Sequence, residues 1–176
     1  MKIGLTGTQS IGKTTLVNAL KELPEFKDYE FRTERSKYLR DLGIPLNMQS
    51  TLKGQMVFLA ERASELIHEN IITDRTVIDV VAFTVSSDII DLQPSQDFYY
   101  LSQNLISEYD VIFYIDPEGT EIEDNNVREI DPSYRDEIDA NIKAIIKMNK
   151  SQTNFYTLIG TTEERISQIQ NFLLTL

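Results

Sequence analysis

The sequence predicts an α/β protein in three layers, with a mainly parallel sheet between two layers of helices. Five short segments typical of strands, most of them apolar, alternate with longer segments in which apolar residues recur at helical spacing. The first run leads at once into a glycine-containing loop and then a helical pattern. Strands that alternate with helices form a mainly parallel sheet that is covered on both faces. We therefore expect a mainly five-stranded α/β/α fold.

The first half of the chain alternates between the two patterns in a regular way. We expect, in order, a strand at 2–6, a helix up to Pro24, a strand at 29–33, helices at 34–42 and 49–68, and a strand at 70–74. Proline cannot continue the first helix, and Gly43 with Pro45 breaks the next. The long helix is predicted because apolar residues recur in it every three or four positions.

The second half continues the alternation after one long polar insertion. We expect helices at 77–86 and 95–107, a strand at 109–115, a helix with the stripe Ile138 to Ile146, a strand at 155–159 and a closing helix with the stripe Ile166 to Leu173. The run 109–115 is the clearest buried strand. Residues 118–132 are acidic and poor in apolar side chains, so we expect an exposed, mobile lid over about 117–135. The expected fold uses residues 1–176 as one domain.

Composition narrows the class of protein. The 176 residues carry a formal net charge of −11 and contain no cysteine, which excludes disulfides and thiol catalysis. No run approaches the ~20 apolar residues of a membrane span, and no basic, apolar leader precedes the first strand, so we expect a cytoplasmic protein. An acidic chain is repelled by nucleic acid. The one basic cluster, Arg32, Arg35, Lys37 and Arg40, is too small for a duplex-binding surface.

The segment Gly7 to Thr14 matches G-x-x-x-x-G-K-[ST] at every fixed position. In this phosphate-binding loop, or P-loop, glycines let backbone N–H groups point inward around phosphate oxygens, and the following helix adds its positive end. Lys13 would reach the β- and γ-phosphates of ATP, and the Thr14 hydroxyl would ligate Mg²⁺. The expected ATP-binding residues are Gly7, Thr8, Gln9, Ser10, Ile11, Gly12, Lys13, Thr14 and Thr15.

Acidic residues end or follow three of the expected strands. In a parallel sheet ligands bind at the carboxyl ends of the strands, which would bring Glu34, Asp74 and Asp116 to the P-loop edge. Asp74 is the favoured magnesium-side acid, and Asp116 is the alternative because its strand is even more apolar. Glu34 is either the base for an acceptor hydroxyl or an acid that the helix dipole favours in a first turn.

Other polar and aromatic residues have two interpretations each. Arg128 and Arg135 close over the phosphates as part of the lid, or they neutralise the acids around them in solvent. His68, the only histidine, is expected at the surface or as a helix cap rather than as a catalyst. The aromatic residues 98–100 are expected in the core more than on a nucleobase.

Five segments together resemble the small P-loop kinases: Gly7–Thr14, Thr33–Arg35, Ile72–Arg75, Asp124–Arg128 and Tyr134–Glu137. The sequence is most similar to the nicotinamide riboside kinase domain and its AAA-like relatives, and more distantly to deoxynucleoside monophosphate and thymidylate kinases. This resemblance implies roles by position. It places Glu34, Arg35 and Arg75 at the acceptor pocket, with Asp74 beside them, and Arg128 and Arg135 in the lid.

These observations favour a kinase that uses ATP and Mg²⁺ to phosphorylate a nucleoside, a nucleotide or a hydroxymethylated pyrimidine. Similar kinases occur in bacteriophages, which would place the protein in the host cytoplasm.

One alternative is the same chemistry on modified bases or ends in DNA. Another is an ATPase without a small-molecule acceptor. A GTPase is disfavoured because the chain lacks the Asn-Lys-x-Asp motif for guanine. Both monomer and homodimer are compatible with this size.

Overall fold

In the part of the chain that the structure describes, the central sheet has five strands, and all of them are parallel. The structure, a computed structural model, describes residues 1–33, 35–117 and 131–175. The strands lie in the order β2-β3-β1-β4-β5, so chain order and spatial order differ. Their bounds are β1 Lys2–Thr6, β2 Glu30–Arg32, β3 Ile71–Asp74, β4 Val111–Ile115 and β5 Asn154–Leu158. The expected α/β/α class and parallel sheet are confirmed.

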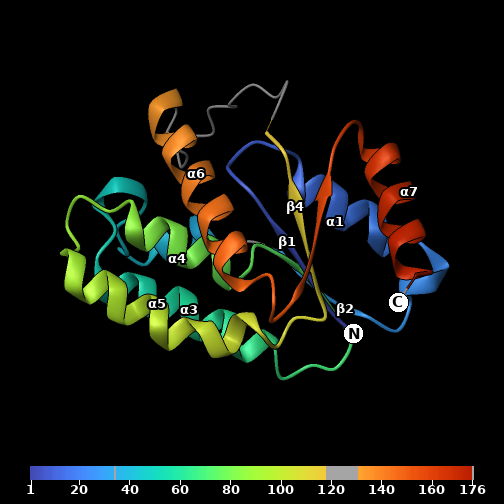
Figure 1. Ribbon diagram of the computed structural model, residues 1–176, viewed down its shortest axis with the longest axis horizontal. Helices are drawn as coiled ribbons and strands as arrows, with labels where there is room; N and C mark the ends of the chain where they lie inside the picture. The colour runs from blue at the N-terminus through green and yellow to red at the C-terminus, as the bar shows by residue number, and fades with distance from the viewer. Residues whose placement is uncertain (34, 118–130, 176) are drawn as a thin grey trace.

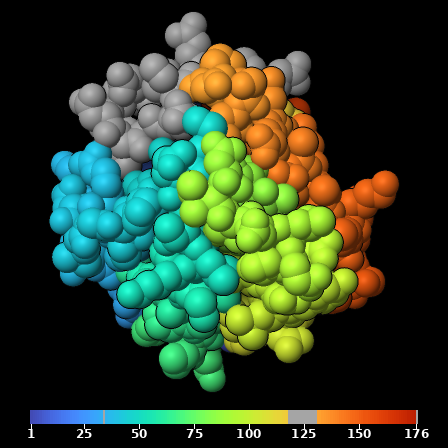
Figure 2. Space-filling model, turned by 90° about the vertical axis from the view of Figure 1, so that its left-hand side faces the viewer, coloured from blue at the N-terminus to red at the C-terminus, as the bar shows by residue number. Residues whose placement is uncertain are grey.

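Helices cover both faces of the sheet, as Figure 1 shows. They are α1 Lys13–Lys21, α2 Ser36–Asp41, α3 Leu52–Glu65, α4 Val77–Val85, α5 Leu92–Ile106, α6 Pro132–Asn149 and α7 Thr162–Leu173, with 3₁₀ turns at Pro24–Phe26 and Asn47–Gln49. Helices α1 and α7 pack on one face, and α4, α5 and α6 form the layer on the other, with α3 beside α4 and α5. In Figure 2, α3 and α5 lie side by side on the outside of this second layer.

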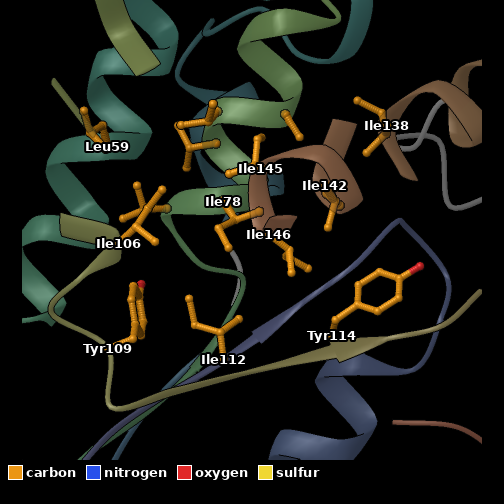
Figure 3. Close-up of a cluster of buried hydrophobic side chains, with 14 of the residues drawn as sticks. Leu59, Ile78, Ile106, Tyr109, Ile112, Tyr114, Ile138, Ile142, Ile145 and Ile146 are labelled. Carbon is orange, nitrogen blue, oxygen red and sulfur yellow. The ribbon is translucent and has the colours of Figure 1, made fainter. Parts of the chain in front are cut away.

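The core is divided between the two faces of the sheet, and β4 contributes to both. Val111, Phe113 and Ile115 belong to the cluster under α1 and α7, whereas Ile112 and Tyr114 belong to the cluster under α4–α6. This alternation follows from the two-residue period of a strand. Figure 3 shows the second cluster, in which the isoleucine stripe of α6 packs toward β4. A strand buried on both faces explains why 109–115 was the clearest apolar run.

Two helices begin three residues away from their expected starts, for local reasons. Helix α3 begins at Leu52 rather than 49, because the Thr51 side chain accepts a hydrogen bond from the Gly54 N–H and caps the helix there. Helix α5 begins at Leu92, three residues before the expected start. Its Pro94 lies in the first turn, where the missing N–H has no helical partner in any case.

The expected lid falls largely on residues 118–130, which lie outside the described part of the chain. Its last residues are described, and they are helical: α6 begins at Pro132, and the Asp131 side chain caps it by accepting a hydrogen bond from the Ser133 N–H at 2.8 Å. The carboxyl end of the expected lid is therefore the first turn of a long core helix. Across the residues that the structure describes, no helix is long and apolar enough to span a membrane.

Candidate active site

The strand order places the P-loop between two other strand ends. Strand β1 lies in the middle of the sheet, with β3 on one side and β4 on the other. In the β1–β3 register Leu5 is level with Asp74, and in the β1–β4 register Thr6 is level with Tyr114. The residues after β1, β3 and β4 therefore meet at one edge. This is the edge at which parallel α/β sheets bind ligands.

The backbone of the P-loop requires its two glycines. Gly7 has φ 144° and Gly12, which precedes α1, has φ 83°. A Cβ on Gly7 would lie 2.9 Å from the Ile115 carbonyl oxygen and would also overlap the Ile11 side chain. No other residue fits there without moving the end of β4. The loop thus presents its N–H groups at the start of a helix, as phosphate binding requires.

Lys13 lies inside this loop. Its side chain is buried, and its ammonium group donates hydrogen bonds to the carbonyl oxygens of Gly7, at 2.7 Å, and Thr8, at 2.5 Å. Of the other expected ATP-binding residues, Thr8, Gln9 and Ile11 are buried, Ser10 and Gly12 are half-buried, and Thr14 and Thr15 are exposed. A buried ammonium group in the concave side of the loop can neutralise the charge of a triphosphate.

Thr14 and Asp74 meet across the gap between α1 and β3. The Thr14 hydroxyl donates a hydrogen bond to Oδ2 of Asp74, which is buried. The other carboxylate oxygen, Oδ1, is also buried and has no hydrogen-bond partner in the described part of the chain. A cation can satisfy a buried carboxylate oxygen that has no hydrogen-bond donor. A hydroxyl beside a carboxylate, with phosphate oxygens and water, is a ligand set that Mg²⁺ accepts, so these residues fit the ion.

Asp116, the alternative acid, follows β4 at the same edge. It is half-buried, and its backbone N–H donates to the Leu158 carbonyl oxygen at 3.1 Å. The Thr14 hydroxyl, however, points to Asp74. This contact favours Asp74 as the magnesium-side acid.

Asp79 was not expected from the sequence, yet it joins three parts of the site. Its buried carboxylate accepts hydrogen bonds from the N–H of Gly7 at 3.3 Å and of Thr76 at 2.7 Å. It also lies 3.6 Å from the guanidinium of Arg75, which stacks over Phe83. The sequence contained a signal for its place in the helix start, because threonine followed three residues later by an acid is typical of a helix capping box. The structure has this capping box at Thr76 and Asp79. The pattern did not indicate the contact with Gly7.

The expected arginines are distributed between two sides of the loop. Arg135, in the first turn of α6, donates hydrogen bonds from Nε to the Thr8 hydroxyl and from Nη2 to the Pro117 carbonyl oxygen, both at 3.3 Å. Arg35 lies beyond β2, where it pairs with Glu61 at 3.2 Å. Glu34 and Arg128 lie outside the described residues, so their expected roles stay predictions. The structure brings Arg135 to the P-loop.

The aromatic residues 98–100 do not lie near the P-loop. Phe98 is buried in the core cluster under α4–α6, and Tyr100 is exposed. The Tyr99 hydroxyl accepts a hydrogen bond from Asn149 at the carboxyl end of α6, just before β5 begins. The beginnings of the strands form the edge opposite the P-loop. Phe98 therefore serves the core, which was the favoured interpretation, and the half-buried Tyr99 packs against the same cluster, whereas Tyr100 lies at the surface.

Arg165 is a second residue that the sequence did not indicate. It lies on α7, is buried, and donates a hydrogen bond from Nη1 to the Ile11 carbonyl oxygen at 2.6 Å. Burial lowers the pKa of this guanidinium from its ordinary value. The closing helix thus holds the P-loop backbone from the side opposite Asp79.

Replacement of Arg165 by methionine is expected to destabilise the protein by about 2 kcal/mol, because the Ile11 carbonyl loses its buried donor. ATP affinity should fall as well, since the loop is less firmly held. Urea unfolding and calorimetric ATP titration measure the two effects. Glu163→Gln, an exposed change in the same turn of α7, is the control and should alter neither. Unchanged stability of Arg165→Met would contradict this role.

Glu65 and Arg62 form a buried ion pair on α3, at 2.8 Å. Burial raises the pKa of Glu65 to about 7, and the Arg62 guanidinium only partly opposes the shift. Because this value lies above the ordinary 4.5, the folded protein binds more protons than the unfolded chain between the two. The contribution of Glu65 to stability is therefore lost as pH rises from about 4.5 to about 7.

Urea unfolding between pH 4.5 and 8 is expected to show this loss. The difference in unfolding free energy between the wild-type protein and Glu65→Gln should fall by at most about 3 kcal/mol as pH rises. Glu69→Gln, which changes an exposed glutamate just after α3, is the control variant. A constant difference for Glu65→Gln over the whole range would show that its carboxyl titrates normally.

Comparison with known proteins agrees with this geometry. A family model described as an AAA domain matches residues 2–165. No curated protein sequence matches the chain. Among solved structures, deoxyadenosine kinase from M. mycoides with bound dCTP is similar with TM-score 0.70 and 21% identity over 100% of both chains. The same kinase with dCMP and a flexible dCDP gives TM-score 0.66 and 21% identity over 99% of both chains.

The NadR protein in complex with NR is similar with TM-score 0.68 and 16% identity, over 87% of this chain and 44% of that one. At these identities the likeness concerns the fold. It agrees with the P-loop kinase fold that the five sequence segments indicated. The family match covers nearly the whole chain, from the start of β1 to the first turn of α7. The chain therefore belongs to the AAA-domain family of P-loop proteins.

Proposed function

We propose that the protein is a kinase that transfers the γ-phosphoryl group of ATP, with Mg²⁺, to a nucleoside or nucleotide. The observation that carries this proposal is the meeting of Thr14 and Asp74 beside the P-loop. A P-loop alone supports binding of a triphosphate. A buried carboxylate oxygen without a donor in the described residues, next to the helix-start hydroxyl, adds the metal side that phosphoryl transfer needs.

In this proposal each residue of the site has a separate role. The P-loop amides hold the β-phosphate, and Lys13 leaves its contacts with the Gly7 and Thr8 carbonyls to bind phosphate oxygens. Thr14 and Asp74 hold Mg²⁺, which neutralises charge on the phosphates when bound. Arg135, which already contacts Thr8, approaches from α6 and stabilises charge that develops in the transition state.

The acceptor would enter on the opposite side of Asp74, toward β2 and α3. Arg35 and Glu61 form an ion pair there, and Arg75 lies at the end of β3. Glu34, which lies outside the described residues, follows β2 in the sequence and stays the predicted base for the acceptor hydroxyl. A deoxynucleoside is the first acceptor to test, because the similar M. mycoides structures are of a deoxyadenosine kinase.

The experiment is phosphoryl transfer from γ-labelled ATP to a panel of acceptors. The panel contains deoxynucleosides, ribonucleosides, nicotinamide riboside, nucleoside monophosphates and free hydroxymethylated pyrimidine nucleotides. Labelled product with a small-molecule acceptor supports the proposal, and Lys13→Ala supplies the matched inactive control. If every acceptor yields only free phosphate, the kinase assignment fails and an ATPase takes its place.

Oligonucleotides with hydroxymethylated bases or free 5′ ends test the remaining alternative. The net charge of −11 opposes binding to DNA, so we expect free acceptors to be preferred over the same groups in DNA. Preference for the oligonucleotide would indicate that the function is DNA modification. Measuring both at 50 mM and 200 mM salt shows whether charge is the cause.

A further inference from the structure

Helix α3 places a buried arginine behind the end of β3. The Arg62 side chain is only 4% exposed. Its Nη1 donates hydrogen bonds to the carbonyl oxygens of Asp74 and Arg75, both at 3.4 Å, while its Nη2 pairs with Glu65 at 2.8 Å. One guanidinium therefore joins two consecutive carbonyl oxygens of the strand end to a carboxylate on its own helix. Residues 62 and 74 are not neighbours in sequence, so the contact depends on the packing of α3 near β3.

The backbone that Arg62 contacts has an unfavourable conformation. Arg75 has φ 81°, in the left-handed region that a residue with a Cβ seldom occupies. Such a conformation persists only where the surroundings hold it. The Arg75 N–H is held by the Leu5 carbonyl oxygen at 3.0 Å, and its carbonyl oxygen is held by Arg62. Both sides of the left-handed residue are therefore fixed by the fold.

We propose that Arg62 is a positioning residue of the phosphoryl-transfer site, which holds the Asp74–Arg75 backbone so that the Asp74 carboxylate faces Thr14. This inference rests on the proposed function, because it gives Asp74 the magnesium side. Arg62 acts through two carbonyl oxygens and touches no reacting atom. Glu65 keeps the guanidinium in place by holding its other amino group.

The same turn of α3 also reaches the acceptor side. Glu61, the residue before Arg62, pairs with Arg35 at 3.2 Å. Adjacent residues of one helix thus contact the segment after β2 and the end of β3. Because a helix is stiff over one turn, α3 links the position of Arg35 to that of the Asp74–Arg75 backbone.

A purely structural role for the ion pair predicts a different result from a positioning role. Exchange of a buried ion pair for apolar residues of similar volume is often neutral or stabilising, whereas removal of one partner leaves an uncompensated charge. The double variant Arg62→Met with Glu65→Met is therefore expected to fold. It leaves the carbonyl oxygens of Asp74 and Arg75 without the guanidinium.

The test is Mn²⁺ binding in the presence of ATP, followed by electron paramagnetic resonance, because Mn²⁺ reports on the metal side without any acceptor. We expect the double variant to bind Mn²⁺ about tenfold more weakly than wild type. Affinity for ATP without metal should stay within about twofold, because the P-loop is untouched. Lys53→Met, an exposed change on the same helix, is the control. A folded double variant with wild-type Mn²⁺ affinity overturns the proposal.

Arg62→Lys is the second variant, and it decides the question if the double variant does not fold. Lysine keeps a positive charge beside Glu65 but lacks the planar fork that spans both carbonyl oxygens and the carboxylate. We expect weaker Mn²⁺ binding and a lower kcat with an unchanged KM for ATP. Wild-type values for both overturn the proposal. Failure of wild type to phosphorylate any acceptor rejects the proposed function instead, and it leaves the Mn²⁺ result intact.

Discussion

Lys13→Ala is expected to lower kcat/KM for ATP about 1000-fold, which corresponds to about 4 kcal/mol. Lys13 is the buried cation in the concave side of the P-loop, where its ammonium group contacts the Gly7 and Thr8 carbonyl oxygens. Because Lys13 is buried, little water can enter to replace its positive charge in the variant. The phosphates therefore lose this electrostatic interaction completely. Steady-state kinetics with the best acceptor, and calorimetric titration with ATP, measure the loss.

Lys21→Ala provides the matched control for this variant. Lys21 lies in the last turn of the same helix, α1, and is exposed. The Lys21→Ala variant should keep kcat/KM for ATP within about twofold of the wild-type value, since exposed charges contribute little. Urea unfolding should show that Lys13→Ala remains folded. A folded Lys13→Ala protein with wild-type affinity and turnover would remove the basis of the ATP-dependent function.

Asp74→Asn is expected to lower kcat about 100-fold and to raise the Mg²⁺ concentration needed for half-maximal activity at least tenfold. The amide has the same shape but no charge for the metal. ATP binding without metal should be unchanged or tighter, because one negative charge near the phosphates is removed. Kinetics over a series of Mg²⁺ concentrations, with ATP titration in a chelator, separate these effects.

Asp116→Asn is the comparison that distinguishes the two candidate acids. Asp74 ends β3 and Asp116 follows β4, both at the P-loop edge, but the Thr14 hydroxyl bonds to Asp74. We expect less than a tenfold change in kcat and an unchanged Mg²⁺ requirement for Asp116→Asn. The reverse order of effects would transfer the metal-side role to Asp116.

Much of the site was predictable because its parts follow local patterns. The P-loop is one continuous segment whose glycines and lysine have set spacings, and it lies between β1 and α1 as expected. Asp74 was expected at the same edge because the carboxyl ends of parallel strands lie together. Its contact with Thr14 agrees with that expectation. These inferences needed only strand direction and residue order.

The supporting residues were not predictable from any local pattern. Asp79 contacts Gly7 across 72 positions of sequence, and Arg165 contacts Ile11 across 154. On a helix, a buried arginine looks the same in sequence as an exposed one, since both lie at polar positions. Arg62 and Arg165 are buried because their guanidinium groups meet carbonyl oxygens of other segments. Only packing decides which polar residue finds such a partner.

Residue order alone was sufficient for the α/β class, the parallel sheet, the phosphate loop and the acid at the end of β3. These features depend on periodicity and on short motifs, which are complete within a few turns of chain. The three-dimensional arrangement decided that Thr14 bonds to Asp74 and that Arg135 contacts Thr8. It also decided that arginines of α3 and α7 donate hydrogen bonds to backbone carbonyl oxygens of the site. The reason is physical: hydrogen bonds and ion pairs depend on distance in space, which spacing along the chain does not determine.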